Sequence, residues 1–527
     1  MEDKRGFMKK ILIGILILVV GFGVFKYLQK TQEDNKYKKM LVCSNLVDIE
    51  NKNKFPNLIN SNETKKFYDE FCKQGNDFVW FEQNLTLNHK SNELRKAIEE
   101  SYNHGLNDQF YHKEEINSLI KTYKNTTFQK IEDRINFVNK IEIILSDSYI
   151  SLANDIYYGI TDWSKFKSLQ FSHDKILAKK ITDEKKLKQL EMNITNEVEE
   201  EKVRKFEWEK PQKAKFSAAS NLLKSSSEDK IYSTLNGLHP QFKEYSRLVN
   251  ALKIYRDKKA DRQKINKIIL NIERFRWITN NYDKSAKAVS VNIPSFKLQV
   301  LEYGEPAWNM RVIVGKPQRP TPILDAELTH ATLNPYWTAP DTIIKEDILK
   351  KDNVAEYVES HNMKVFMNGK NGKTLINHKD INWTLHKGKK DVPFTFRAEP
   401  GKDNPLGSIK FKFPNKYSVY MHDTNKKEFF QHEYRAFSSG CVRLNEPIKL
   451  FAYFMNKNDI DINSLNSKND PEQSVSLNAT IPISFKYMTA VADKNFNVTF
   501  YEDIYSYDET NMKAIKGAEK LFGLNFK

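Results

Sequence analysis

The most informative stretch of this sequence reads Tyr417-Ser-Val-Tyr-Met-His-Asp-Thr424 and, after a charged connector, Arg435-Ala-Phe-Ser-Ser-Gly-Cys-Val-Arg-Leu-Asn445. The first segment alternates in part, as a β-strand does when it leads to an exposed end. The second segment places two serines and Gly440 directly before Cys441, which lies nineteen residues after His422. A thiol preceded by small residues, with a histidine upstream, is a candidate nucleophilic site.

Cys441 is the candidate nucleophile. The reference pKa of cysteine is about 8.5, so the thiol needs a base or a lowered pKa near neutral pH, and His422 is the candidate base. Glycine at position 440 lets the backbone N–H groups of Gly440 and Cys441 turn toward a reacting carbonyl, as in an oxyanion hole. Tyr420 shares the face of His422 on a strand, so its hydroxyl is a candidate supplement. The competing interpretation is a small buried cysteine and a structural histidine.

Other residues are candidates for support and substrate binding. Ser438 or Ser439, through a hydroxyl or a backbone carbonyl, is expected to orient the histidine, because a strand would turn Asp423 the other way. Arg443 is expected to hold a substrate carboxylate by a bidentate contact, with a structural ion pair as an equal alternative. Trp337 is a candidate for a pocket or a lid, although a tryptophan is more often part of a core. Histidines and cysteines are too scattered for a ligand set, so neither a metal nor a cofactor is predicted.

The sequence has His422, then fifteen residues, and then Ser438-Ser-Gly-Cys-Val-Arg443. This pattern resembles the signature of the L,D-transpeptidases, the YkuD-type cysteine enzymes of bacterial cell walls. In most of them the motif reads Ser/Thr-His-Gly-Cys, and Ser439 stands where that second histidine is common. By having serine at this place, the chain resembles the large Gram-negative subgroup, whose members have an N-terminal scaffold region and a capping insertion. The resemblance runs in order from Arg274 to Asp508. Looser similarities to the scaffold region lie at Phe78–Phe81, His104–His112 and Leu238–Leu248.

This resemblance implies an α+β fold: a mostly helical N-terminal scaffold, then a mainly β YkuD-like catalytic domain with a helical and loop lid insertion. It also implies an enzyme that attacks the bond between the diamino acid and the D-Ala of a peptidoglycan tetrapeptide stem. The acyl group would pass to the amine of a second stem and make a 3→3 cross-link. Capture by water would instead make an L,D-carboxypeptidase, and capture by a protein lysine would anchor a lipoprotein to the wall. Carbapenem-type β-lactams are expected to capture the thiol.

Two other classes are open. An NlpC-type cysteine peptidase also cuts stem peptides, but there the cysteine precedes the histidine, whereas here His422 comes first. A non-catalytic wall-associated scaffold would keep the fold and could lose the thiol. The intact Cys441, His422 and Gly440 argue against that class.

Residues 1–28 are predicted to be an uncleaved signal-anchor. The uncharged run Ile11–Phe25 is flanked by lysines and no small-residue cleavage site follows it, so a cleaved signal is the lesser alternative. Lysines on both sides leave the orientation open. The wall substrate of the resembling family puts the catalytic domain in the periplasm, anchored to the inner membrane. Residues 29–63 are expected to be a tether, and Cys43 lies too far from the apolar run to be a lipid-attachment site.

The rest of the chain changes from a helical to a strand pattern. Apolar residues recur at spacings of three and four, which predicts a helical scaffold over 64–271. The charged stretch 180–210 is expected to be a solvated helix or an insertion. Alternating runs from Ala288 onward predict a mainly β catalytic domain over 272–527. Residues 341–403 interrupt that pattern with a helix and a Gly-rich loop, an excursion that is unusual in a compact domain unless it is functional. The resemblance implies a substrate-capping lid here, and a surface insertion without a function is the alternative.

The net charge limits the classes of partner, and the cysteine count limits the number of disulfides. The formal net charge of +16 fits nucleic acid, an anionic membrane or an acidic polymer. No basic stripe with interleaved aromatics occurs, so nucleic acid is not a predicted partner. The predicted partners are peptidoglycan stem peptides, as donor and as acceptor amine, and the inner membrane. Three cysteines are too few for a disulfide framework, and a pair between Cys43 and Cys72 is left open.

Overall fold

The computed structural model describes residues 43, 57–76, 78–169, 211–279, 282–369, 372–389, 391–458, 460–461 and 472–523. The predicted signal-anchor and the charged stretch 180–210 lie outside these residues. The chain divides into two compact units, one of residues 1–160 and 213–240 and one of residues 161–212 and 241–527. Over the described ranges, no helix combines the length and the apolar character needed to cross a membrane.

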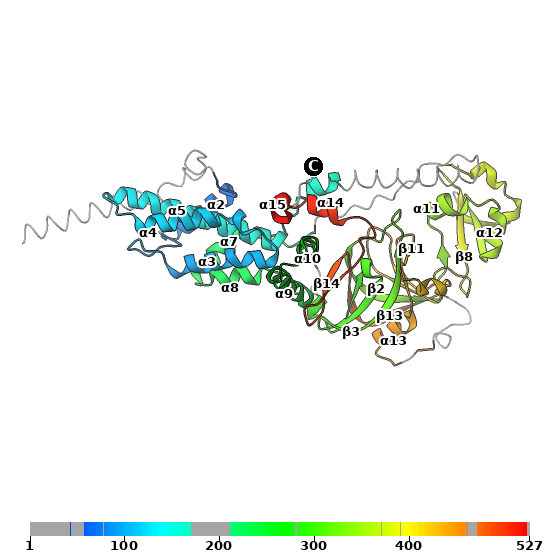
Figure 1. The fold of residues 1–527 in the computed structure, drawn as a ribbon. Helices are drawn as coiled ribbons and strands as arrows, with labels where there is room; N and C mark the ends of the chain where they lie inside the picture. Colours follow the sequence, from blue (N-terminus) through cyan, green and yellow to red (C-terminus); the bar gives the residue numbers. More distant parts are fainter. Residues whose placement is uncertain are drawn as a thin grey trace, which may run out of the picture. The chain divides into compact units, whose positions relative to one another are not determined.

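The first unit is helical, as the sequence predicted (Figure 1). The longest of its helices within the described residues is α5, in which every residue from Ile141 to Ala153 is buried, because other helices cover it on several sides. The helices are α2 Ser61–Lys73, α3 His89–Ser101, α4 Lys113–Asn125, α5 Ile131–Tyr158, α7 Ala218–Ser227 and α8 Ile231–Gly237.

Buried carboxylates on α5 hold other segments of this unit. Asp147 accepts backbone hydrogen bonds from Ile59 (2.9 Å) and Asn60 (2.8 Å), just before α2. Glu142 accepts from the backbone N–H of Trp80 at 2.7 Å. Because burial disfavours the charged carboxylate, the pKa of Glu142 is raised to about 7. Glu142 thereby satisfies a buried backbone donor, and Asp147 holds the segment just before α2.

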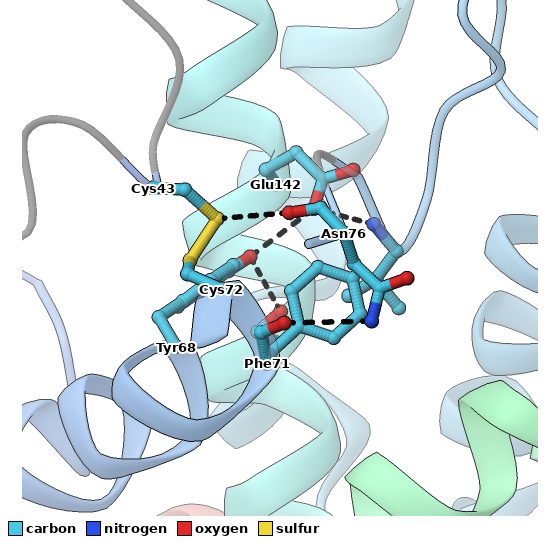
Figure 2. The surroundings of a disulfide bond; sticks show 8 residues. Cys43, Tyr68, Phe71, Cys72, Asn76 and Glu142 are labelled. Carbon is cyan, nitrogen blue, oxygen red and sulfur yellow. Dashed lines mark hydrogen bonds between the residues drawn. A yellow bond between two sulfur atoms is a disulfide. The ribbon is translucent and has the colours of Figure 1, made fainter. Parts of the chain in front are cut away.

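A disulfide joins Cys43 to Cys72 at the C-terminal end of α2 (Figure 2). The two Cα atoms lie 5.3 Å apart, an ordinary separation for this bond. One turn earlier on α2, the Tyr68 hydroxyl donates to Glu142 at 3.1 Å. The pairing that the sequence left open is therefore formed, and Cys441 is the free thiol.

The second unit is built on a nine-stranded sheet in the order β11-β3-β12-β10-β9-β4-β13-β1-β2, and it closes on itself because β2 also pairs with β3. Its apolar core includes Val289 and Val291 from β1, Ile483 and Phe485 from β13, and Leu450 from a helix that follows the cysteine motif. This closed sheet confirms the predicted mainly β fold.

The main-sheet strands are β1 Ala288–Asn292, β2 Lys297–Glu302, β3 Glu305–Gly315, β4 Leu324–Leu333, β9 Ile409–Lys412, β10 Met421–His422, β11 Ala436–Ser438, β12 Val442–Leu444 and β13 Gln473–Lys486. A separate pair is β14 Ala490–Ala492 and β15 Val498–Phe500. The described helices of this unit outside the lid include α9 Lys243–Asp257, α10 Arg262–Phe275, α13 Pro447–Phe454, α14 Asp508–Lys513 and α15 Ala518–Phe522.

The insertion that the sequence predicted to be a lid, called the lid below, contains more strand than the predicted helix and loop. A four-stranded sheet in the order β5-β8-β6-β7 and the lid helices pack together around an apolar core of their own. Gly369 and Gly372 of the predicted Gly-rich loop pair with each other at the end of the β6–β7 hairpin. Local pattern does not reveal this sheet, because β6 also pairs with β8, which comes later in the chain. The lid elements are β5 Trp337–Thr338, α11 Asp341–Ile343, the π-helical turn η7 Ile344–Ile348, α12 Val354–Ser360, β6 Met363–Gly369, β7 Gly372–Ile376, the 3-10 turns η8 His378–Asp380 and η9 Trp383–His386, and β8 Phe394–Ala398.

Candidate active site

The parallel neighbours β10 and β12 bring the motif residues together. His422 lies opposite Arg443 in the register, and the N–H of Val442 donates to the Tyr420 carbonyl at 3.1 Å. Because side chains alternate along a strand, Tyr420 and Cys441 project from the same face as the His422–Arg443 pair. Four of the predicted site residues therefore meet on one face of the sheet.

His422 is buried, with 5% of its surface exposed, and its ring is oriented by the backbone. Its Nδ1–H donates to the carbonyl oxygen of Asp423, which leaves Nε2 as the acceptor. Burial, and then the charge of Arg443, lower the pKa of His422 to about 3. The imidazole is thus neutral at ordinary pH, as a base must be to accept a proton.

The orienting group for His422 differs from the expected serines. A backbone carbonyl performs that role because the chain turns directly after β10 and points the Asp423 carbonyl at the ring. The Asp423 carboxylate faces elsewhere, as expected, and accepts from the N–H and the hydroxyl of Ser408, both at 2.9 Å.

The turn before Cys441 is closed by its own hydrogen bonds. The Ser438 hydroxyl donates to the Cys441 carbonyl at 2.6 Å, and the Gly440 N–H donates to the Ser438 oxygen at 3.2 Å. Gly440 has a φ of 109°, which favours glycine. Its N–H is therefore directed at Ser438 in this structure, whereas the sequence suggested it as an oxyanion donor.

Residues distant in sequence support this turn from behind. The Thr321 hydroxyl donates to the Gly440 carbonyl at 2.9 Å and accepts from the Gly315 N–H at 2.8 Å. The Tyr505 hydroxyl donates to the Gly315 carbonyl at 2.7 Å. All these groups are buried, so the turn has a fixed position relative to the end of β3.

Tyr420 connects the thiol to the base of the lid. Its hydroxyl is hydrogen-bonded to the Cys441 side chain, and the Trp337 indole donates to it. Burial and the neighbouring Cys441 raise the pKa of Tyr420, so the phenol keeps its proton. Trp337 itself belongs to the lid core. Tyr420 therefore contacts the thiol directly, and Trp337 contacts Tyr420.

Two cations flank the histidine. Lys410 of β9 lies opposite His422, with its Nζ 4.2 Å from the ring centre of Tyr420. Arg443 lies on the other side, and its Nε is buried with no hydrogen-bond partner among the described residues. Burial is the main cause that lowers the pKa of both cations, and Cys441 acts in the opposite direction. Their charge favours a thiolate or a bound carboxylate on this face.

Comparison with known proteins agrees with this geometry. Residues 286–462 match the YkuD family, described as the L,D-transpeptidase catalytic domain, and residues 62–252 match the family described as the Scaffold domain. The chain carries a YkuD-type L,D-transpeptidase catalytic domain. A Haemophilus influenzae protein described as a candidate L,D-transpeptidase is 30% identical over 267 residues, which cover 50% of this chain and 52% of that protein. The chain thus matches about half the length of this curated relative.

Solved structures include L,D-transpeptidases of low similarity. The enzyme from Mycobacterium smegmatis is 14% identical, with a TM-score of 0.20, over 38% of this chain and 58% of that one. L,D-transpeptidase 1 of Mycobacterium tuberculosis is 15% identical, with a TM-score of 0.17, over 38% of this chain and 60% of that one.

Several residues around the candidate site were not predicted from the sequence, among them Lys410, Thr321 and Tyr505. Lys410 stands in the alternating run Ile409-Lys-Phe-Lys412, which indicates that it faces away from the core, but only strand pairing places it beside His422. Within the described residues, no group of three or more His, Cys, Asp and Glu side chains is placed to hold a metal ion. A thiol, a neutral imidazole, a phenol and two cations form a set suited to acyl transfer.

Proposed function

We propose that this chain is a peptidoglycan L,D-transpeptidase with Cys441 as nucleophile and His422 as general base and acid. The observation that carries this proposal is the face shared by the free thiol, the neutral imidazole and the phenol bonded to the thiol. The family match of residues 286–462 supports the same reaction class.

The first half-reaction forms a thioester. The thiol proton of Cys441 moves to Nε2 of His422, and the sulfur attacks the carbonyl between the diamino acid and D-Ala. The Cys441 N–H and the Tyr420 hydroxyl hold the oxyanion. The C–N bond then breaks, and His422 returns the proton to the amine of the leaving D-Ala.

The second half-reaction transfers the acyl group. The side-chain amine of a second stem attacks the thioester and gives its proton to His422, which returns a proton to the departing sulfur. The product is a 3→3 cross-link. Ser438, Ser439 and Gly440 shape the turn that presents the thiol. Arg443, whose buried Nε has no partner among the described residues, would hold a substrate carboxylate, and Trp337 would contact the substrate from the lid side.

The same thioester has other possible fates, which the test must separate. Water would give tripeptide, as in an L,D-carboxypeptidase, and a protein lysine would give a wall-anchored lipoprotein. A non-catalytic scaffold would give no product.

We place the catalytic domain in the periplasm, held at the inner membrane by residues 1–28, with release after signal cleavage as the alternative. The disulfide between Cys43 and Cys72 supports an oxidising compartment. The proposed substrate also lies outside the inner membrane.

The test incubates the full chain, purified in detergent, with disaccharide-tetrapeptide and reads the products by mass spectrometry, with Cys441→Ala as control. The expected product is a dimer lighter by one D-Ala, absent with the variant. Tripeptide alone would change the assignment to carboxypeptidase. Identical products from wild type and variant, with stem amines and lipoprotein lysines both offered as acceptors, would contradict the catalytic proposal.

A further inference from the structure

Arg319 joins the lid to the turn that carries the nucleophile. Its Nη1 donates to the Asp347 carboxylate at 2.6 Å and to the Ser439 hydroxyl at 2.9 Å. Its Nη2 donates to Glu346 at 2.6 Å and to the second oxygen of Asp347 at 3.2 Å. One guanidinium therefore contacts two lid acids and a residue two positions before Cys441.

The loop that carries Arg319 is held in place. Its N–H donates to the Lys316 carbonyl at 2.9 Å, and only 6% of its surface is exposed. A Cβ at Gly315 would lie 2.2 Å from the Arg319 carbonyl oxygen, so the close approach requires glycine there. The loop after β3 of the closed sheet consequently holds the guanidinium in one position.

The two acids are equally well placed on the lid. Glu346 and Asp347 lie on the π-helical turn η7, whose Ile344 and Ile348 are buried in the lid core. Short π-helical turns often mark functional positions. The acid side chains are 37% and 39% exposed, so they lie at the boundary between the lid and solvent.

We propose that Arg319 is a positioning residue that latches the lid onto the turn carrying Cys441. A bidentate Arg–carboxylate contact fixes direction as well as distance, so lid closure and the placement of Ser439 are coupled. Opening the lid breaks the contacts with Glu346 and Asp347 and leaves the guanidinium with Ser439 alone.

The latch has a consequence for the fate of the thioester, which rests on the proposed function. An acyl-enzyme that must be captured by an amine loses product to water whenever the site is open. A latched lid that excludes water therefore favours transfer over hydrolysis. Weakening the latch raises the proportion of tripeptide without removing any group that takes part in the chemistry.

The test replaces both lid acids, Glu346→Gln with Asp347→Asn, in the full chain. These positions are partly exposed, so the variant is expected to fold, and circular dichroism checks that it does. The first readout is the rate at which iodoacetamide alkylates Cys441, the free thiol among the three cysteines. We expect this rate to rise about fivefold or more, the lower bound for a typical coupling between two sites.

The second readout is the ratio of tripeptide to cross-linked dimer, which we expect to rise in the same variant. Arg319→Lys keeps the charge but not the bidentate fork, so it should fall between wild type and the double variant in both readouts. The matched control is Glu359→Gln, which removes a lid ion pair with Lys379 (3.1 Å) whose two side chains are both more than half exposed. That control should behave as wild type.

An alkylation rate unchanged in the double variant, or raised equally by Glu359→Gln, would overturn the latch. Alkylation needs no substrate, so this result is independent of whether cross-linking is observed. A faster alkylation without any product from wild type would retain the latch and contradict the proposed function instead.

Discussion

A buried, uncharged histidine beside two cations determines the electrostatics of the candidate site. Burial and Arg443 favour the neutral form of His422, and the carbonyl of Asp423 fixes its tautomer. The Ser-Ser-Gly-Cys motif was enough to select Cys441 and His422, because both lie in one continuous stretch. Lys410 reaches the site through strand pairing and Arg319 through a hydrogen bond to Ser439, and no local pattern encodes either contact.

The lowered pKa of His422 predicts a specific loss of stability in acid. The unfolded chain takes up a proton near pH 6.5, whereas the folded state does so only near pH 3. The contribution of His422 to the free energy of unfolding is therefore present above pH 6.5. It is lost as the pH falls toward 3, at roughly 1.4 kcal/mol per pH unit. His422→Gln should lose less stability than wild type between pH 7 and pH 5, measured by chemical denaturation. The exposed His330→Gln serves as control, and equal slopes for all three proteins would contradict the assignment.

Removal of the Tyr420 hydroxyl is predicted to slow the chemistry and leave the fold intact. An oxyanion donor lost from a site of this kind costs about 100-fold in kcat. Tyr420→Phe should therefore lower kcat for D-Ala release by about that factor with KM little changed. Tyr453→Phe removes a hydroxyl that bonds to Glu302 elsewhere on the domain and should retain full activity. A Tyr420→Phe enzyme within threefold of wild type would exclude the phenol from the oxyanion site.

At the scale of elements, α5 shows how a helix can be apolar and yet carry buried acids. The helical pattern of the first unit was readable from apolar spacing, but Glu142 and Asp147 look like ordinary surface charges in sequence. Their role depends on segments that come before them in the chain, Ile59–Asn60 and Val79–Trp80. The lid sheet was missed for the same reason, since β6 and β8 are separated in sequence.

The raised pKa of Glu142 predicts that the first unit becomes less stable as the pH rises. The folded state holds a proton on this group up to about pH 7, whereas the unfolded chain releases it near pH 4.5. Its contribution is full below pH 4.5 and declines through pH 7, by roughly 1.4 kcal/mol per pH unit. In the Glu142→Gln variant, the free energy of unfolding should decline less with rising pH than in wild type, as measured by denaturant unfolding of the full chain. The exposed Glu99→Gln is the control, and a decline as steep in Glu142→Gln as in wild type would assign the effect to other groups.

At the scale of the whole molecule, two of the three cysteines form a disulfide and the third, Cys441, remains a thiol. Sequence could not pair Cys43 with Cys72, because a pairing depends on the distance between Cα atoms in the fold. The disulfide joins two residues that are 29 positions apart in the sequence. For a loop of that length it should contribute about 3.6 kcal/mol to the stability of the first unit.

A thiol titration checks this division. Without reductant, the denatured chain should titrate one thiol, and after reduction it should titrate three. Cys72→Ser should expose a second thiol and lower the unfolding midpoint, whereas Cys441→Ser should abolish the thiol signal at little cost in stability. Three thiols in the unreduced chain would show that the bond is absent.

The central claim is that Cys441 carries the acyl group. The direct measurement incubates the full chain with tetrapeptide stem, quenches in acid and maps the tryptic peptide Ala436–Arg443 by mass spectrometry. The account predicts that this peptide gains the mass of the tripeptide acyl group as a thioester, lost on treatment with hydroxylamine and absent in Cys441→Ala. Cross-linked product formed by a chain whose Ala436–Arg443 peptide is never acylated, or an acyl group found on another residue, would contradict it.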